Sequence, residues 1–195
     1  DPFSPVVTAG RVVVIEAGHP YPDARSLAAG EQLLQFIAAS PAQAALLFLI
    51  SGGTSSLVER LPPQMHLDEL QRLNQWLLGS GWDIHHMNAL RKRLSAIKGG
   101  RLAGSLQGRR ALQLLISDVP GDVPSDIGSG LLVPDEATEI DEAALPEWLH
   151  TLLRRVPPMS LPTPSTFDAI ETHIVASLDQ ALAAAAASAR RQGHE

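Results

Sequence analysis

The sequence contains no cysteine, which excludes a disulfide framework and thiolate-bound metal sites. The same absence favours a reducing compartment, so we expect a cytoplasmic protein. Aromatic residues make up only 4% of the 195 residues, so a core must consist mainly of Leu, Ala, Val and Ile. The apolar runs Ala44–Ile50 and Leu112–Ile116 fall far short of the roughly 20 residues that a membrane helix needs. We therefore expect no membrane partner.

Positive charge is scarce and unevenly placed. The chain has 15 Lys and Arg against 21 Asp and Glu, a formal net charge of −6. The stretch from 88 to 110 nevertheless holds seven basic residues and no acidic one. Nucleic acid binds a broad positive face, so we expect no nucleic-acid partner. A small anion suits the local basic segment better, with a solvated basic helix face as the alternative.

Hydrophobic content of 45% allows one domain spanning residues 1–195. Four short apolar segments predict buried strands: Arg11–Ile15, Ala45–Ile50, Leu112–Ile116 and His173–Ala176. Helical patterns occupy about 24–39, 66–80, 83–98, 141–155 and 179–192, the last with Asp179 as N-cap and Gly193 as its end. This alternation predicts a layered α/β fold with a mostly parallel sheet.

Polar or glycine-rich turns follow the first three predicted strands. They are Gly18–Asp23, Ser51–Ser56 and Ser117–Asp122. In an open α/β sheet the ligand binds outside the carboxyl ends of the strands, so these turns should meet on one rim. The sequence therefore predicts a ligand site there.

The second turn has the composition of an anion-binding loop. Gly52 and Gly53 allow close approach of the backbone to a ligand, and the hydroxyl groups of Ser51, Thr54 and Ser55 add donors. It matches neither a Walker A motif nor G-x-G-x-x-G, and a plain tight turn is the alternative.

The other two turns carry ionisable side chains. Asp118 and Asp122 could hold Mg²⁺ or act as a base towards a hydroxyl group, although aspartate is also favoured in turns for local reasons. Ser125–Gly130 supplies further glycine and hydroxyl groups. His19 and Asp23 lie in the first turn, where Asp23 could also cap the next helix.

The basic stretch divides into two stripes on its predicted helix. Leu90, Leu94 and Ile97 form a buried stripe, and Arg91, Ser95 and Lys98 repeat that spacing one position later. Gly99 and Gly100 end the helix, and Arg101 follows. Such a stripe could hold carboxylate or phosphate, although cations near a helix C-terminus also suit the helix dipole. We expect the remaining charges to be ordinary surface: Arg93, Arg109 and Arg110.

In this order, GHPYPD, LISGGTSSL, NALRKRLSAIKGGRLA and LISDVPGD with IGSG resemble the glycerate 2-kinase family, which older labels call hydroxypyruvate reductase. The resemblance runs from Val12 to Gly130 and more loosely over Asp179–Gly193. It departs from the family at Leu131, where proline is usual, and in the run Thr54–Ser56. The resemblance implies a Rossmann-like three-layer α/β fold and transfer of phosphate from ATP, with a divalent metal, to the 2-hydroxyl of D-glycerate.

The resemblance also implies site roles. Lys98 and Arg101 would offset the charge of substrate and transferring phosphate, and Asp118 or Asp122 would bind Mg²⁺ or orient the attacking hydroxyl. The implied residues that bind substrate or phosphate are His19, Asp23, Ser51, Gly52, Gly53, Thr54, Ser55, Arg91 and Ser95. Loss of Lys98 should then slow the reaction by orders of magnitude and leave the fold intact.

The resemblance also bears on the extent of the chain. Family members carry an N-terminal segment with an important lysine and a C-terminal MOFRL domain, so we expect this chain to be a central part and inactive alone. The expected partners are glycerate, a nucleotide and the rest of the polypeptide; a homodimer is left open. An NAD(P)H-dependent hydroxypyruvate reductase is an alternative, disfavoured because no strand precedes G-x-G-x-x-G. A non-catalytic anion-binding module is another.

Overall fold

One parallel sheet organises the chain. The computed structural model describes residues 12–135, 140 and 142–194. Its strands β1 (Leu46–Ile50), β2 (Ala111–Ile116) and β3 (Ile170–Ala176) lie in that order, all parallel. The helices are α1 (Ala24–Ala39), α2 (Thr54–Leu57), α3 (Leu67–Gly79), α4 (Ile84–Arg93), α5 (Arg101–Ser105), α6 (Glu147–Arg155) and α7 (Leu178–Arg191). The predicted α/β class and parallel sheet are confirmed.

Three of the four predicted strands are present, and the first is not. Val12–Ile15 forms no strand, and the side chains of Val12, Val13 and Val14 are 60%, 77% and 51% exposed; Arg11 lies outside the described residues. The prediction of a buried strand here is wrong. An apolar run predicts a strand only if a neighbouring strand accepts its backbone hydrogen bonds, and the described residues provide none for this segment.

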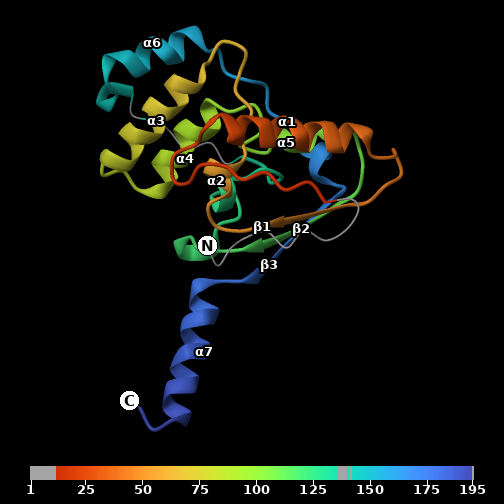
Figure 1. The fold of residues 1–195 in the computed structure, drawn as a ribbon, viewed down its shortest axis with the longest axis vertical. Coiled ribbons are helices and arrows are strands. Elements are labelled where there is room, and N and C mark those ends of the chain that lie inside the picture. Colours follow the sequence, from red (N-terminus) through yellow and green to blue (C-terminus); the bar gives the residue numbers. More distant parts are fainter. Residues whose placement is uncertain (1–11, 136–139, 141, 195) are drawn as a thin grey trace.

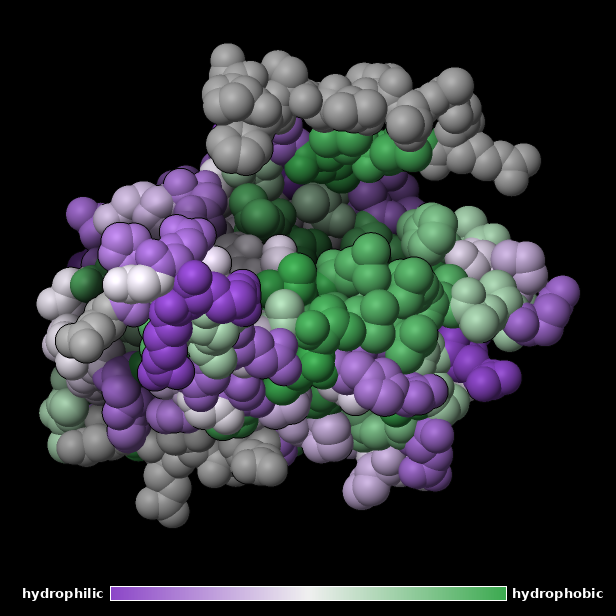
Figure 2. Space-filling view, turned by 90° about the horizontal axis from the view of Figure 1, so that it is seen from below, coloured by the Kyte–Doolittle hydropathy of each residue, from purple (hydrophilic) through white to green (hydrophobic). Residues whose placement is uncertain are grey.

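The two faces of the sheet differ in burial. Helices α1 and α5 lie over one face (Figure 1), and the side chains of Leu46, Ile50 and Leu115 pack into the core beneath them. Alternate residues point the other way, so Leu47 and Leu49 are 59% and 73% exposed. Figure 2 shows a broad apolar area on the face seen from below. The described residues thus form two of the three layers expected.

A second apolar cluster joins the helices beside the sheet. It contains side chains from α3, α4 and α6, which lie together in Figure 1: Leu70, Leu73, Leu77, Leu90, Leu149 and Leu152. Helix α3 matches its predicted span closely. Helix α6 begins at Glu147, after Pro146, and a single 3₁₀ turn, Glu142–Ala144, precedes it. The predicted start at residue 141 lies outside the described residues.

The predicted helix over 83–98 is shorter in the structure. Helix α4 ends at Arg93, and the Ser95 hydroxyl accepts from the backbone N–H groups of Ile97 and Lys98. A serine that bonds to nearby backbone in this way competes with helix formation. The stripe of Arg91, Ser95 and Lys98 is therefore not one helix face, because only Arg91 is helical.

Helix α7 extends away from the rest of the chain (Figure 1), and none of its residues is buried. Its N-cap is Ser177, whose hydroxyl accepts from the backbone of Gln180, so the prediction of Asp179 as the cap is wrong by two residues. Gly193 has φ of +84° just beyond the helix, as its predicted end requires. None of the helices within the described part of the chain is long and apolar enough to cross a membrane.

Candidate active site

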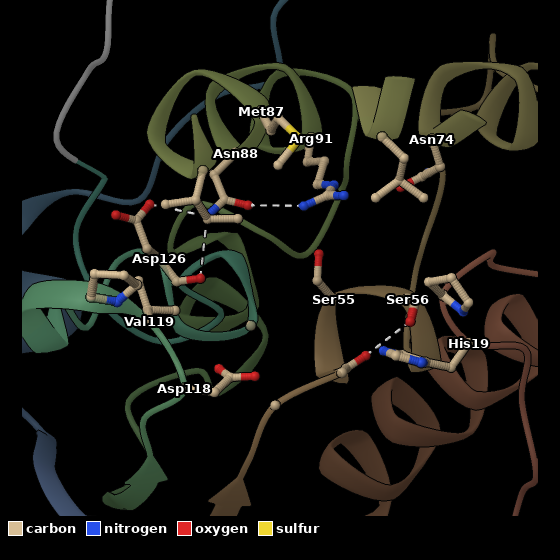
Figure 3. A pocket seen from close by; sticks show the side chains of 17 residues that line it. His19, Ser55, Ser56, Asn74, Met87, Asn88, Arg91, Asp118, Val119 and Asp126 are labelled. Carbon is tan, nitrogen blue, oxygen red and sulfur yellow. Dashed lines mark hydrogen bonds between the residues drawn. The ribbon is translucent and has the colours of Figure 1, made fainter. Parts of the chain in front are cut away.

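A cavity of about 390 Å³ lies at the carboxyl ends of β1 and β2, beneath helices α3 and α4 (Figure 3). The three predicted turns meet here: His19, Gly53, Ser55 and Asp118 all line it. Parallel strands bring their carboxyl ends to one edge, which is why the turns after β1 and β2 share this rim. The first turn joins them although none of the described residues before it forms a strand.

The turn after β1 depends on its two glycines. Gly53 has φ of +83° and begins the short helix α2. A Cβ atom on Gly52 would overlap the carboxylate of Asp118. Thr54 donates its hydroxyl to the carbonyl of Ser51 at 2.6 Å, and neither residue lines the cavity. Of the five predicted turn residues, Gly52, Gly53 and Ser55 therefore reach the site.

Asp118 follows β2 and is exposed to the cavity. Its carboxylate has no hydrogen-bond or ion-pair partner among the residues that the structure describes. Asp122 does not line the cavity and lies in a 3₁₀ turn, with φ of +53°.

Carboxylate oxygen is the kind of ligand that Mg²⁺ prefers, and Mg²⁺ often takes one or two carboxylates together with substrate phosphates. No group of three His, Asp or Glu side chains within the described ranges could hold a metal ion alone. The donor set therefore fits a magnesium ion shared with a phosphate-bearing ligand.

Helix α4 supplies the wall opposite Asp118. Ile84, Met87, Asn88 and Arg91 all line the cavity, and their spacing places them on one helix face. The Nη1 atom of Arg91 lies 3.5 Å from Oδ1 of Asn88, and its buried Nε has no hydrogen-bond partner in the described part of the chain.

Burial lowers the pKa of Arg91, and the negative charge of Glu59 opposes that shift. A guanidinium group keeps its proton in proteins. Arg91 therefore presents a positive charge to the cavity, and it forms no ion pair with a carboxylate of the described residues.

Lys98 lies in the interior and does not line the cavity. Its side chain is 1% exposed and forms an ion pair with the buried carboxylate of Glu59, which also accepts from the Ser95 hydroxyl at 2.5 Å. The pKa of Lys98 is lowered because burial disfavours its charged form, and the adjacent charge of Glu59 offsets only part of this shift. The structure thus separates Lys98 and Ser95 from Arg91. Because the pair is buried, we now expect the loss of Lys98 to destabilise the fold.

Arg101 and Lys92 also bind groups within the protein. Arg101 donates through Nη1 to the carbonyl groups of Lys92 and Lys98, at 3.0 and 2.8 Å. The ammonium group of Lys92 lies 2.9 Å from a carboxylate oxygen of Asp135, and both side chains are largely buried. Arg101 therefore stabilises the chain around Gly99 and Gly100 and does not reach the cavity.

Two arginines expected to be ordinary surface also make internal contacts. Arg109 is only 8% exposed and donates to the carbonyl groups of Ser40 and Leu106, so the surface prediction for it is wrong. Arg93 donates to the carbonyl of Val156 at 2.7 Å. Of the basic stretch, Arg91 alone lines the cavity.

Asp23 acts in the first turn as the cap of α1. Its carboxylate accepts from the backbone of Arg25 and Ser26, and it pairs with the Arg25 guanidinium at 2.6 Å. The hydrogen bond from the Arg25 side chain lowers the pKa of Asp23 to about 2. Asp23 does not line the cavity, whereas His19 does, with its ring beside Gly53.

The buried back of the site consists of polar residues that the sequence patterns above did not predict. Asn88 and Asp126 line the cavity and are 1% and 6% exposed. The spacing of Asn88, one helical turn before Arg91, could have identified it. Asp126 lies within Ser125–Gly130, where the sequence predicts only glycine and hydroxyl groups as contributors to the site.

Comparison with known proteins relates this chain to one family. Residues 4–158 match the family described as "Domain of unknown function (DUF4147)". Glycerate 2-kinase of Pyrococcus horikoshii is 38% identical over 75% of this chain and 33% of its own length. D-glycerate 2-kinase of Thermotoga maritima is 32% identical over 92% of this chain and 44% of its own length. A relative from Agrobacterium vitis with a provisional hydroxypyruvate reductase label is 40% identical over 98% of this chain and 45% of its own length.

The same relationship appears in the fold. The crystal structure of glycerate kinase from Thermotoga maritima superposes with a TM-score of 0.67 at 30% identity, covering 91% of this chain and 43% of that one. A protein structure from Pyrococcus horikoshii gives 0.69 at 29% identity, covering 96% and 45%. The chain thus spans less than half the length of these relatives. Since the family match extends over most of the chain, the chain belongs to the DUF4147 family, and it aligns with part of relatives named glycerate 2-kinase.

Proposed function

We propose that the polypeptide containing this chain phosphorylates the 2-hydroxyl of D-glycerate with ATP and Mg²⁺. The observation that carries the proposal is that Arg91 and Asp118 line the same cavity. Neither has an ion-pair partner among the described residues. A cation and a carboxylate left free in a cavity suit a ligand with both anionic and metal-binding groups.

Each residue has a distinct task in this proposal. Arg91 would bind the carboxylate of glycerate, and the turn at Gly52 and Gly53 would bring backbone N–H groups to anionic oxygens. Asp118 would hold the magnesium ion, whose chemistry there is to neutralise phosphate charge. Phosphoryl transfer depends mainly on positioning and charge stabilisation, and these residues provide both.

Lys98 and Arg101 would act as positioning residues. They hold the Gly99–Gly100 turn, whose N–H groups donate to the carbonyls of Ser129 and Gly130 at 3.0 and 2.6 Å. The loop that contains Ser129 and Gly130 also contains Gly128, which lines the cavity. The two cations would therefore support the site without touching substrate.

Activity of the intact protein would require more than this chain. The relatives are more than twice as long as the aligned region, and one face of the sheet exposes Leu47 and Leu49. Further segments packed on that face would complete the domain and contribute to nucleotide binding. We accordingly expect the isolated chain to be inactive.

The absence of cysteine suits a reducing compartment, so the expected location of the protein is the cytoplasm.

A paired assay on the complete polypeptide tests the proposal. ADP formation that depends on glycerate supports a kinase, whereas NADH oxidation that depends on hydroxypyruvate without ADP formation would replace the proposal with the reductase alternative. Asp118→Asn should lower the kinase rate by about 10²-fold or more, because the lost charge helps to bind metal and phosphate. Asp122→Asn is the matched comparison and should have a far smaller effect. Equal losses would contradict the assignment to Asp118.

A further inference from the structure

A chain of hydrogen bonds runs from the buried back of the cavity to its rim. The Asn88 amide nitrogen lies 3.2 Å from the backbone carbonyl of Asp126 and 3.0 Å from its carboxylate (Figure 3). The Ser129 hydroxyl lies 3.0 Å from Oδ1 of Asn88, and the Ser55 hydroxyl lies 2.8 Å from that of Ser129. Four residues from three separate segments therefore share one connected network.

The direction of the hydrogen bonds is fixed at Asn88. A backbone carbonyl only accepts, so the amide atom facing Asp126 must be the NH₂ group. The other amide atom is then the oxygen, and this agrees with its neighbour Arg91, which only donates. Asn88 Oδ1 is thus an acceptor, and it is buried with its residue 1% exposed.

That acceptor determines the role of each hydroxyl group. An amide oxygen can only accept, so the proton in the bond between Ser129 and Asn88 must be the single hydroxyl proton of Ser129. Ser129 then has only lone pairs for its bond to Ser55. Ser55 must therefore donate its own proton to Ser129, which leaves the lone pairs of Ser55 Oγ for the cavity.

The backbone around Ser129 holds its side chain between Asn88 and Ser55. Ser129 is fully buried and has φ of +59°, which is uncommon for a residue other than glycine. Its carbonyl accepts from the N–H of Gly99 at 3.0 Å, so the turn held by Lys98 also holds Ser129. The polarity of Ser55 is thus determined by residues that do not themselves need to touch a ligand.

We propose that Ser55 accepts a hydrogen bond from a hydroxyl group of the substrate and does not donate to its carboxylate or to phosphate. Asn88 and Ser129 are positioning residues that impose this polarity. The inference rests on the proposed function, and it reverses the expectation that the Ser55 hydroxyl serves as a donor to anionic oxygens. Arg91, which faces the same space, would bind the carboxylate (Figure 3). The site would thereby distinguish a hydroxy acid from a simple acid.

The test compares two ligands on the complete polypeptide by calorimetry or by competitive displacement. Glycerate carries hydroxyl groups, whereas propionate has the same carboxylate and carbon chain without them. Ser55→Ala should weaken glycerate binding by about 10-fold, the usual worth of one hydrogen bond, and leave propionate binding within about twofold. Ser40→Ala, which removes a hydroxyl bonded to the end of α1, is the control and should affect neither ligand.

A second variant separates polarity from mere loss of structure. Ser129→Ala frees the Ser55 proton, so glycerate should bind more weakly while propionate binds as well as before or better, because Ser55 can now donate to a carboxylate. A purely structural defect would weaken both ligands alike, and that result would overturn the role of Ser129.

Two results with Ser55→Ala would overturn the proposal for Ser55 itself. An equal loss for both ligands would identify Ser55 as a donor to the carboxylate, and no loss for either would show that it does not contact the ligand. Failure of the unmodified protein to bind glycerate would instead refute the proposed function, and this inference with it.

Discussion

Arg91 and Lys98 come from one basic segment, yet they occupy opposite kinds of environment. Arg91 lines the cavity, and its guanidinium has no carboxylate partner among the described residues. Lys98 lies in the interior, paired with Glu59, whose carboxylate also accepts from Ser95. The comparison teaches that a cation is available to a ligand where the fold leaves it without an ion-pair partner. Most other cations of the segment bind acceptors within the protein: Lys92, Arg93, Lys98, Arg101 and Arg109.

The largest effect should come from breaking the buried pair. Glu59→Gln leaves the ammonium of Lys98 buried without a counter-charge, so the free energy of unfolding should fall by about 3–5 kcal/mol. Urea unfolding followed by circular dichroism measures this. The double variant Glu59→Gln with Lys98→Met is the control, and it should recover part of the loss because no charge remains buried. A loss below about 1 kcal/mol in the single variant would place the pair with ordinary surface ion pairs.

The next effect should appear in binding and not in stability. Arg91→Ala removes the unpaired cation, so glycerate affinity in the complete polypeptide should fall by about 10- to 100-fold, the worth of a hydrogen bond to a charged group. The free energy of unfolding should change by less than about 1 kcal/mol, since no internal ion pair is lost. Calorimetric titration and urea unfolding of one preparation report both quantities. Arg91→Lys should retain part of the affinity. If Arg91→Ala lowered the stability but not the affinity, Arg91 would have a structural role like that of Lys98.

The smallest effect should come from Asp23, which is paired with Arg25 in solvent. Its folded pKa of about 2 lies below the ordinary value of 3.8, so its stabilising contribution is complete above about pH 4 and is lost as the pH falls through 2. Asp23→Asn keeps an N-cap acceptor but cannot titrate. The melting temperature of the unmodified chain should exceed that of the variant at pH 5, and the difference should shrink as the pH approaches 2. A difference that is constant with pH would contradict this origin.

Local patterns predicted most of the secondary structure. The three strands, helices α1 and α3, and the end of α7 at Gly193 all follow from apolar runs, helical spacing and turn residues. One failure arose from a neighbouring strand that is absent, and the other arose from a local side-chain contact. Val12–Ile15 is apolar but has no neighbouring strand in the described part of the chain, and α4 stops at Arg93 where Ser95 bonds to nearby backbone.

The sequence also predicted only part of the candidate site. The sequence by itself determined which turns carry the polar groups, because glycine, aspartate and serine at strand ends have local reasons to form a rim, and Asp118 and Ser55 were found on this ground. Only the tertiary structure decided which charges are free. Whether a lysine meets a substrate or a glutamate depends on the acid that the fold brings beside it, and Glu59 lies 39 residues before Lys98. The pairing of charges and the direction of a chain of hydrogen bonds depend on which side chains the fold brings into contact. The order of residues along the sequence does not specify those contacts.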